Sequence, residues 1–269
     1  MSQGIETTID FAEESGWGLI VPEQDYGRSL DILEQYRAEN RHWPWRQKIS
    51  TQGVLFDWGS LGWMLLVSFF FWIQTHASAG FREAGLMDAV AVSHGQWWRL
   101  FTAIFLHADL GHIAMNASIG LVLLGFTMGN YGTGLGLLAA YLAGAGGNVA
   151  TWIIFSAGHR SLGASGMVMG CVGLLAAQSL SGSRTRTRLK YALSGLVGGI
   201  MLFALLGLSP ESDVLAHLGG FVSGFALGGL LKMKSRLAQN TTANVFAGII
   251  FCVLVILPWW LALNHAAVQ

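Results

Sequence analysis

Long runs without a charged residue constrain this 269-residue chain more than any other feature. Stretches free of Asp, Glu, Lys and Arg cover 58–81, 110–159, 161–183, 191–210, 214–231 and 237–269. A helix needs roughly 20 mostly apolar residues to cross a bilayer. With 53% hydrophobic and only 11% charged residues, the chain lacks the polar surface of a soluble globule of this size. The pattern predicts an all-α polytopic membrane protein.

One of these runs must contain two helices. Residues 110–159 are too many for a single span, and the segment Gly129-Asn130-Tyr131-Gly132-Thr133-Gly134 in the middle is a turn signal. Splitting the run there gives seven predicted spans in all.

The distribution of Lys and Arg predicts the orientation of these spans, because cytoplasmic loops carry an excess of basic residues. With the N-terminus inside, only Arg82, Arg99 and Arg160 fall outside, so twelve of the 15 basic residues are cytoplasmic. The opposite orientation would place the cluster Arg184–Lys190 outside. We therefore expect a cytoplasmic N-terminus and, in a bacterium, an inner (plasma) membrane location.

Residues 1–50 form a polar arm that does not resemble a cleavable signal peptide, so the first span would itself direct insertion. Residues 17–21 favour a short strand, and residues 23–40 favour a helix with Tyr26, Leu30 and Leu33 on one face. The arm carries no chemical motif. We interpret it as a docking or stabilising appendage in preference to a ligand-binding domain.

Polar residues open three of the predicted spans, and all three run from outside to inside. His112 and Asn116 open the second span, Ser165 opens the fourth and His217 opens the sixth. Their depth below the outer surface should therefore be similar. Polar and ionisable groups inside a bilayer are costly and are functional candidates by default. A lone histidine could be a packing residue, but the convergence of four such groups indicates a site.

Small residues indicate how two of these spans pack. A row at every fourth position lets helices approach closely, and the sixth span contains such a row in Ala216, Gly220, Gly224 and Gly228. The fourth span has Gly163, Gly166, Gly170 and Gly173 on nearby turns. We expect the two helices to pack at short separation and to bring the Ser165 hydroxyl within reach of His217.

A serine with a nearby histidine suits nucleophilic catalysis, because the hydroxyl needs a positioned base. No acidic residue lies in the second, fourth or sixth span, so the arrangement predicts a dyad whose histidine is oriented by packing. His112 and Asn116 share a helix face at i and i+4 and can donate to an oxyanion, with the Ser165 N–H as third donor. Gly163 leaves room for the substrate backbone.

These motifs together resemble the rhomboid family of intramembrane serine proteases. The residues that carry the resemblance are Trp98-Arg99, His107, His112-Ile113-Ala114-Met115-Asn116, Gly163-Ala164-Ser165-Gly166, Ala216-His217-Leu218-Gly219-Gly220 and Gly224. The resemblance implies a six-helix core over 58–232, with Ser165 as nucleophile, His217 as base and His112, Asn116 and the Ser165 N–H as oxyanion donors. Residues 233–269 would add one C-terminal span. Family members often carry an aromatic residue where this chain has Met169.

Further residues are expected to support the site. Gly163, Gly166 and Gly220 would serve substrate binding or helix packing, as would Trp98 and Arg99 in the apolar first outer loop, 82–109. That loop suits an interfacial structure beside a substrate entrance or an aromatic belt. His107 should brace it. The short polar segment 209–213 is the candidate for a mobile cap.

The leading functional prediction is an intramembrane serine endopeptidase that cleaves transmembrane proteins near the outer membrane face, without metal or other cofactor. The alternative is a non-proteolytic rhomboid-like protein that binds membrane clients. A transporter or metal protein using His94, His107, His112 and His217 is a weaker reading, since the spans contain no HExxH motif or carboxylate-rich ligand set. The sequence contains no basic domain that would support nucleic-acid binding. The expected partners are the bilayer and the transmembrane substrates.

Overall fold

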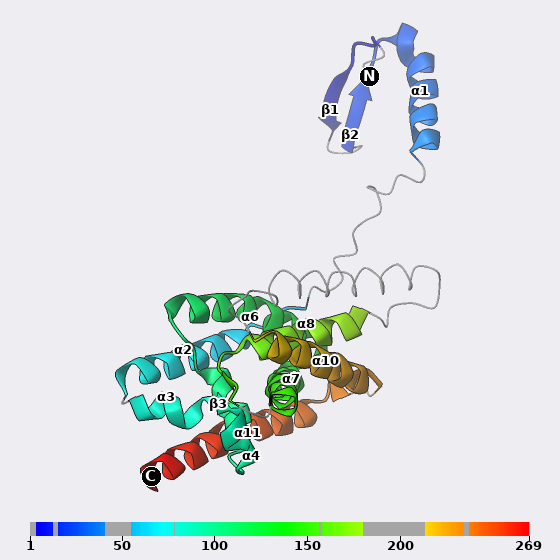
Figure 1. The fold of residues 1–269 in the computed structure, drawn as a ribbon. Helices are drawn as coiled ribbons and strands as arrows, with labels where there is room; N and C mark the ends of the chain where they lie inside the picture. The colour runs from blue at the N-terminus through cyan, green and yellow to red at the C-terminus, as the bar shows by residue number, and fades with distance from the viewer. Residues whose placement is uncertain are drawn as a thin grey trace. The chain divides into compact units, whose positions relative to one another are not determined.

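The computed structural model describes residues 4–12, 16–40, 55–77, 79–155, 158–179, 213–233 and 237–268. The contacts divide the chain into two compact units, Met1–Gly53 and Val54–Gln269, which Figure 1 shows together. The expected fifth span, 191–210, the basic cluster Arg184–Lys190 and residues 209–212 of the expected cap lie outside the described residues.

The first unit is a hairpin followed by a helix. Strands β1 (Thr8–Ala12) and β2 (Gly16–Ile20) pair antiparallel, and a short 3-10 turn, η1 (Glu23–Asp25), leads into α1 (Tyr26–Glu39). The predicted strand and helix are confirmed, whereas β1 was missed although Ile9 and Phe11 alternate with polar residues there. The register pairs Ile9 with Leu19 and Phe11 with Trp17, which places these four side chains on one face of the hairpin.

The second unit is a bundle of long helices. They are α2 (Ser60–His76), α6 (Leu110–Tyr131), α7 (Thr133–Ile154), α8 (Ser165–Ser179), α10 (Val214–Met233) and α11 (Thr241–Val268). Between α2 and α6 the chain forms α3 (Ala79–Gly85), β3 (Met87–Asp88), α4 (Ala89–Ser93), α5 (Arg99–Thr102) and the 3-10 turn η3 (Ala103–Phe105). Strand β4 (Arg160–Ser161) pairs antiparallel with β3.

Four helices within the described residues, α6, α7, α10 and α11, are long and apolar enough to cross a membrane. This is fewer than the seven predicted spans. Three predicted spans are missing from this set. One lies outside the described residues. The other two correspond to α2, which ends at His76 after 17 residues, and to α8, which begins only at Ser165 and has 15 residues. Gly163 is the reason for the late start of α8, because its φ of 127° is not helical. The structure therefore supports a multi-pass helical membrane protein.

The turn predicted in the middle of the 110–159 run is confirmed. Gly132, with φ 90°, separates α6 from α7. A Cβ atom there would also clash with the Ala238 carbonyl oxygen at 2.6 Å. The turn therefore packs closely against the segment before α11. Asn244 of α11 then accepts hydrogen bonds from the backbone N–H groups of Gly134 and Leu135, at 3.0 and 3.2 Å.

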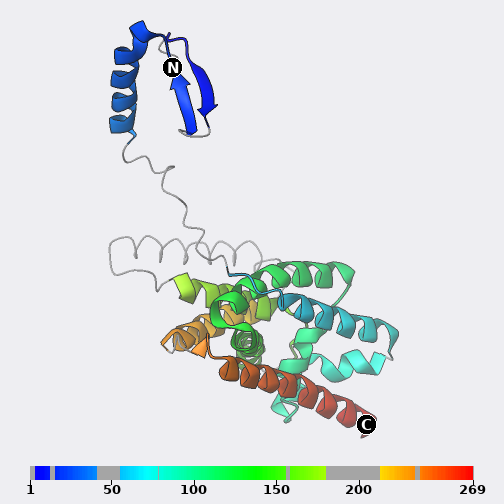
Figure 2. The same cartoon turned by 180° about the vertical axis from the view of Figure 1, so that it is seen from behind.

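Helix α7 lies inside the bundle. Figures 1 and 2 show it nearly end-on, with α8 and α10 on one side and α11 on the other. Its Tyr141 is fully buried, contacts the rings of Phe105 and Phe251, and donates a hydrogen bond to the Leu254 carbonyl at 3.2 Å. Thus α11 packs into the core of the second unit.

Apolar residues of the segment 82–109 are also part of the core. Leu100, Ile104, Phe105 and Leu106 are buried against the helices. Trp259 of α11 stacks on Phe81 of α3 with ring centroids 4.5 Å apart and extends this packing to the C-terminal helix.

Candidate active site

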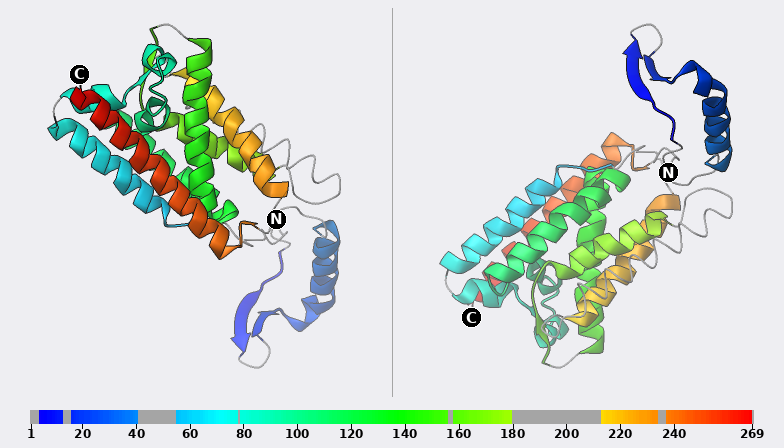
Figure 3. Two further views of the ribbon diagram at one scale, coloured as in Figure 1. Left: turned by 90° about the horizontal axis from the view of Figure 1, so that it is seen from below. Right: turned by 90° about the horizontal axis from the view of Figure 1, so that it is seen from above.

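Helices α8 and α10 approach until their backbones touch. Figure 3 shows them side by side, and a Cβ atom added at Gly220 or Gly224 would overlap the carbonyl oxygen of Gly166 or Gly170. Contacts this close require glycine, because any side chain would have to displace backbone. The short separation predicted from the glycine rows is confirmed.

This packing opens onto a cavity of about 440 Å³ at the starts of α6, α8 and α10. Four residues that were predicted to form a site line this cavity, namely His112, Asn116, Ser165 and His217. Two of the predicted glycines, Gly163 and Gly166, line it as well. Gly220 lies one turn beyond His217, in the contact with Gly166. The fold thus brings groups from three helices to one concave surface, while their chemical roles stay predictions.

Ser165 is the first residue of α8, and His217 lies in the first turns of α10. The N–H of Ser165 belongs to the helix start, where backbone donors have no partner four residues earlier. His217 is only 2% exposed, so its imidazole is held by surrounding protein. Met169, one turn after the serine, is also buried and lines the cavity.

His112 is oriented toward the serine turn. Its Nδ1 accepts a hydrogen bond from the Ala108 N–H at 3.4 Å, so a neutral ring carries its proton on Nε2. A Cβ atom added at Gly163 would lie 2.9 Å from this Nε2 and 3.8 Å from the Ser165 hydroxyl. Gly163 therefore leaves the space through which His112 reaches the region in front of the serine.

Asn116 is buried one turn further along α6. Its side-chain nitrogen donates to the His112 carbonyl at 3.1 Å. An amide group has two N–H donors, so a second one is left for a ligand in the cavity. The start of α6 is fixed by Asp109, whose Oδ1 accepts the His112 N–H at 2.8 Å.

His107 was predicted to brace the loop 82–109, and the structure shows that its side chain also bonds the turn before Ser165. Its Nε2 accepts a hydrogen bond from the N–H of Ala164 at 3.4 Å, next to Ser165. Gln74 of α2 bonds both main-chain groups of His107, donating to the carbonyl at 2.6 Å and accepting from the N–H at 3.1 Å. Burial lowers the pKa of His107 to about 3, and the nearby His112 ring acts in the same direction. His107 is therefore neutral and remains a hydrogen-bond acceptor.

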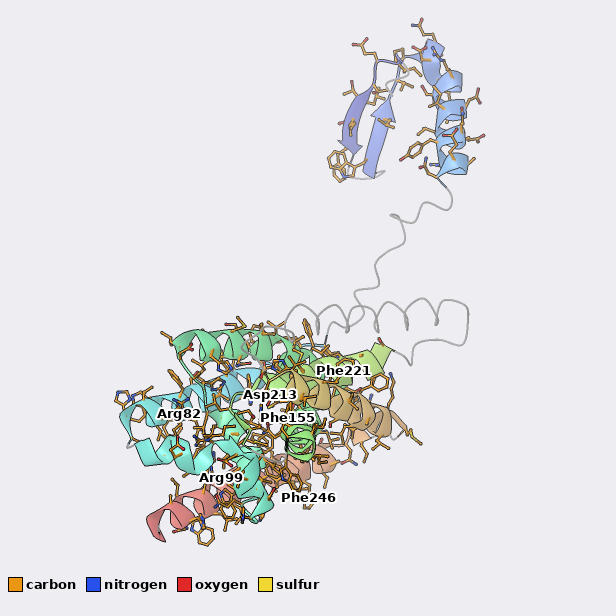
Figure 4. The ribbon with its side chains drawn as sticks, viewed as in Figure 1. Arg82, Arg99, Phe155, Asp213, Phe221 and Phe246 are labelled. Carbon is orange, nitrogen blue, oxygen red and sulfur yellow. The ribbon has the colours of Figure 1, made fainter. Side chains whose placement is uncertain are left out.

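Trp98 and Arg99 do not line the cavity. Arg99, labelled in Figure 4, donates from Nη1 to the carbonyls of Glu83 and Leu86, both at 2.7 Å, and from Nε to Gln96. The Trp98 ring lies against His265 of α11, with centroids 5.4 Å apart. The carbonyls at the end of α3 and just after it bind the guanidinium of Arg99. Both residues therefore serve packing of the segment 82–109.

The sequence reasoning missed four polar residues that line the cavity, Asp109, Asn148, Ser161 and Asp213. Asn148 of α7 donates to the Leu100 carbonyl at 2.7 Å. The sequence signal that could have identified Asn148 is a polar amide within an otherwise apolar run. Asp213 was seen only as the end of a mobile cap, but its carboxylate accepts the Ala216 N–H at 2.9 Å at the start of α10.

Comparisons with known proteins identify the family of this chain. Residues 94–234 match the model of the Rhomboid domain. The chain is 34% identical over 171 residues to RHOMBOID-like protein 1 of Arabidopsis thaliana, which covers 62% of this chain and 43% of that protein. It is 31% identical over 157 residues to RHOMBOID-like protein 5 of the same plant, covering 58% and 50%.

A bacterial relative is similar at the same level. The Rhomboid protease GluP of Bacillus subtilis is 32% identical over 147 residues, which is 52% of this chain and 27% of that protein. The chain thus spans half or less of the length of these relatives.

Proposed function

Because this chain belongs to the rhomboid family, we propose that it is an intramembrane serine endopeptidase acting on transmembrane protein substrates. The observation that carries the proposal is the single cavity lined by Ser165, His217, His112 and Asn116. A relative named as a rhomboid protease supports the same assignment.

In this proposal Ser165 and His217 carry the covalent chemistry. The Ser165 oxygen forms a bond to the substrate carbonyl carbon while its proton passes to His217. The tetrahedral adduct then expels the peptide nitrogen, which takes that proton and leaves as an amine. Water attacks the remaining acyl ester, gives a proton to His217 and releases the serine after the proton returns. Atoms and charges balance without a cofactor.

Three donors would stabilise the oxyanion of the adduct. They are the Nε2–H of His112, the second amide N–H of Asn116 and the backbone N–H of Ser165. The orientation of His112 beside Gly163 supports this role, because fixed donors aimed at developing charge need no reorganisation during the reaction.

We further propose the topology of six core spans plus one C-terminal span, with the N-terminus in the cytoplasm and the active site toward the outer face. The four described spans, the shorter helices α2 and α8 and the excess of basic residues on one side support it. In a bacterium the membrane would be the inner membrane.

Replacement of Ser165 tests the function. Ser165→Ala should abolish cleavage of a transmembrane reporter and labelling by a fluorophosphonate probe. Ser179→Ala is a matched control, because it changes a serine at the far end of α8 whose hydroxyl donates to the Ala176 carbonyl of the same helix. Cleavage retained by Ser165→Ala would overturn the proposal. A wild type that neither cleaves nor labels but still binds membrane clients would favour the non-proteolytic alternative.

A further inference from the structure

The position of the proposed base, His217, depends on what fixes the first turns of α10. Asp213 directly precedes α10 and lines the cavity. Its Oδ1 accepts the Ala216 N–H at 2.9 Å, and its carbonyl accepts the His217 N–H at 3.0 Å. The backbone of the proposed base is therefore bonded to Asp213.

The same carboxylate is also bonded to two other segments. The Thr151 hydroxyl, near the end of α7, lies 3.2 Å from Oδ1 and 3.3 Å from Oδ2. His159 Nε2, in the connection between α7 and α8, lies 2.9 Å from Oδ2. Figure 4 labels Asp213 and Phe155 in this region.

His159 is itself held in place. Its ring stacks on Phe155 with centroids 5.1 Å apart and planes inclined by 18°. Its carbonyl accepts the N–H of Ala89 at 3.0 Å. The connection that His159 braces continues through β4 to Gly163 and Ser165, so one carboxylate lies between the segment before the nucleophile and the helix that carries the base.

We infer that Asp213 is a positioning residue for His217, acting by tying the start of α10 to Thr151 and His159. The inference rests on the proposed function and deepens it. The carboxylate takes over the orienting task of an acidic triad member, but through the backbone of α10. Because a small displacement of a catalytic group can cost up to about a hundredfold in rate, a loosened first turn should lower turnover more than substrate binding.

The competing explanation is that Asp213 is only a helix cap. An ordinary cap contributes about 1 kcal/mol to stability, and losing it would not selectively change turnover. Asn240 provides the matched control. It caps α11 by accepting the Ala243 N–H at the same 2.9 Å, yet it does not line the cavity.

The experiment compares kcat, KM, fluorophosphonate labelling rate and melting temperature of the full chain in detergent. Asp213→Ala should lower kcat and the labelling rate about tenfold or more, with KM within about twofold of wild type. Thr151→Val with His159→Ala should lower kcat in the same way although the Ala216 bond remains. The single variant His159→Gln should have a kcat close to that of wild type, because the glutamine amide can replace Nε2 as a hydrogen-bond donor.

Asn240→Ala should keep wild-type kcat while lowering the melting temperature by the amount expected for the loss of one helix cap. Asp213→Asn keeps the acceptor for Ala216 but loses the charge, and its kcat should fall between wild type and Asp213→Ala. Wild-type kcat in the Thr151→Val/His159→Ala variant, or in Asp213→Asn, would overturn the tether and leave only a cap. A loss confined to KM would also overturn it.

The proposed function is judged separately with Ser165→Ala in the same assay. Cleavage by that variant would overturn the protease assignment. If wild type cleaves, Ser165→Ala does not and the tether variants keep their kcat, then only the role of Asp213 is refuted.

Discussion

The two units of this chain use apolar residues in opposite ways. Over residues 4–11 and 16–40 of the first unit, where burial is described, no residue is buried, and Trp17 is 77% exposed. In the second unit Trp63 is 3% exposed, and the helices around it contact one another directly. A hairpin and one helix provide too few layers to enclose a side chain. The apolar content of a segment therefore does not by itself make a core.

The difference bears on where chemistry can occur. Catalytic groups must be held by neighbours whose own positions are fixed. In the second unit the backbone contact between Gly220 and Gly166, and the hydrogen bond between Ala164 and His107, supply such support next to Ser165 and His217. The first unit offers an apolar groove of about 320 Å³ between β2 and α1, but its lining residues include no catalytic group.

The largest expected effect comes from filling the contact between α8 and α10. Gly220→Leu would drive a side chain into the Gly166 backbone, which cannot move aside as a side chain can, at a cost of about 3 kcal/mol or more. We expect loss of cleavage and of the folded protein in detergent, measured by reporter cleavage and thermal unfolding.

Gly229→Leu is the matched control, because it lies in the same helix and a Cβ atom there meets nothing within 4 Å. Equal behaviour of the two variants would contradict the rigid contact that distinguishes the second unit.

A second effect tests whether α11 belongs to the rigid unit. Trp259 is 5% exposed and stacks on Phe70 and Phe81, whereas its neighbour Trp260 is 60% exposed. Trp259→Ala should lower the free energy of unfolding by about 3–5 kcal/mol, and Trp260→Ala by less than about 0.5 kcal/mol. Denaturant titration in detergent measures both. A similar small loss for both would show that α11 is only loosely attached.

A third effect depends on pH. The pKa of His107 is lowered to about 3 in the folded protein against about 6.5 for an ordinary histidine. The unfolded chain therefore binds a proton first, so the stabilisation is complete above about pH 6.5 and is lost progressively as pH falls toward 3. The melting temperature of the second unit should fall over this range. It should fall less in His107→Gln, and parallel curves would refute the role of His107.

The smallest effect is expected from removing the first unit. A chain beginning at Val54 should cleave the reporter at a rate within about twofold of the full chain, because separate compact units fold and act largely independently. Rate measurement in matched detergent tests this. A larger loss with unchanged melting temperature would assign the first unit a part in activity.

Much of the second unit was predictable from local pattern. The turn at Gly132 follows from the glycine cluster around it, and the contact between Gly220 and Gly166 follows from spacing along each helix. The shared cavity of Ser165, His217, His112 and Asn116 follows from the alternating direction of the spans. These features depend on periodicity within one segment or on the alternating direction of successive spans.

Other features depend on partners far apart in the chain. Met87–Asp88 pairs with Arg160–Ser161, and two-residue strands carry no pattern of their own. Arg99 binds main-chain carbonyls, which every residue possesses, so these hydrogen bonds had no sequence signal. The partners of Asp213 lie 62 and 54 residues earlier.

The contacts of Gly220 with Gly166 and of Gly224 with Gly170 fix the position of α10 along α8 and its rotation about its own axis. Sliding α10 along α8 by a single residue would drive a larger side chain into a facing carbonyl, and twisting it would do the same. Ser165 and His217 must then move together with these two helices. Under the proposed function, entry of the scissile segment would therefore require displacement of other elements around this coupled pair.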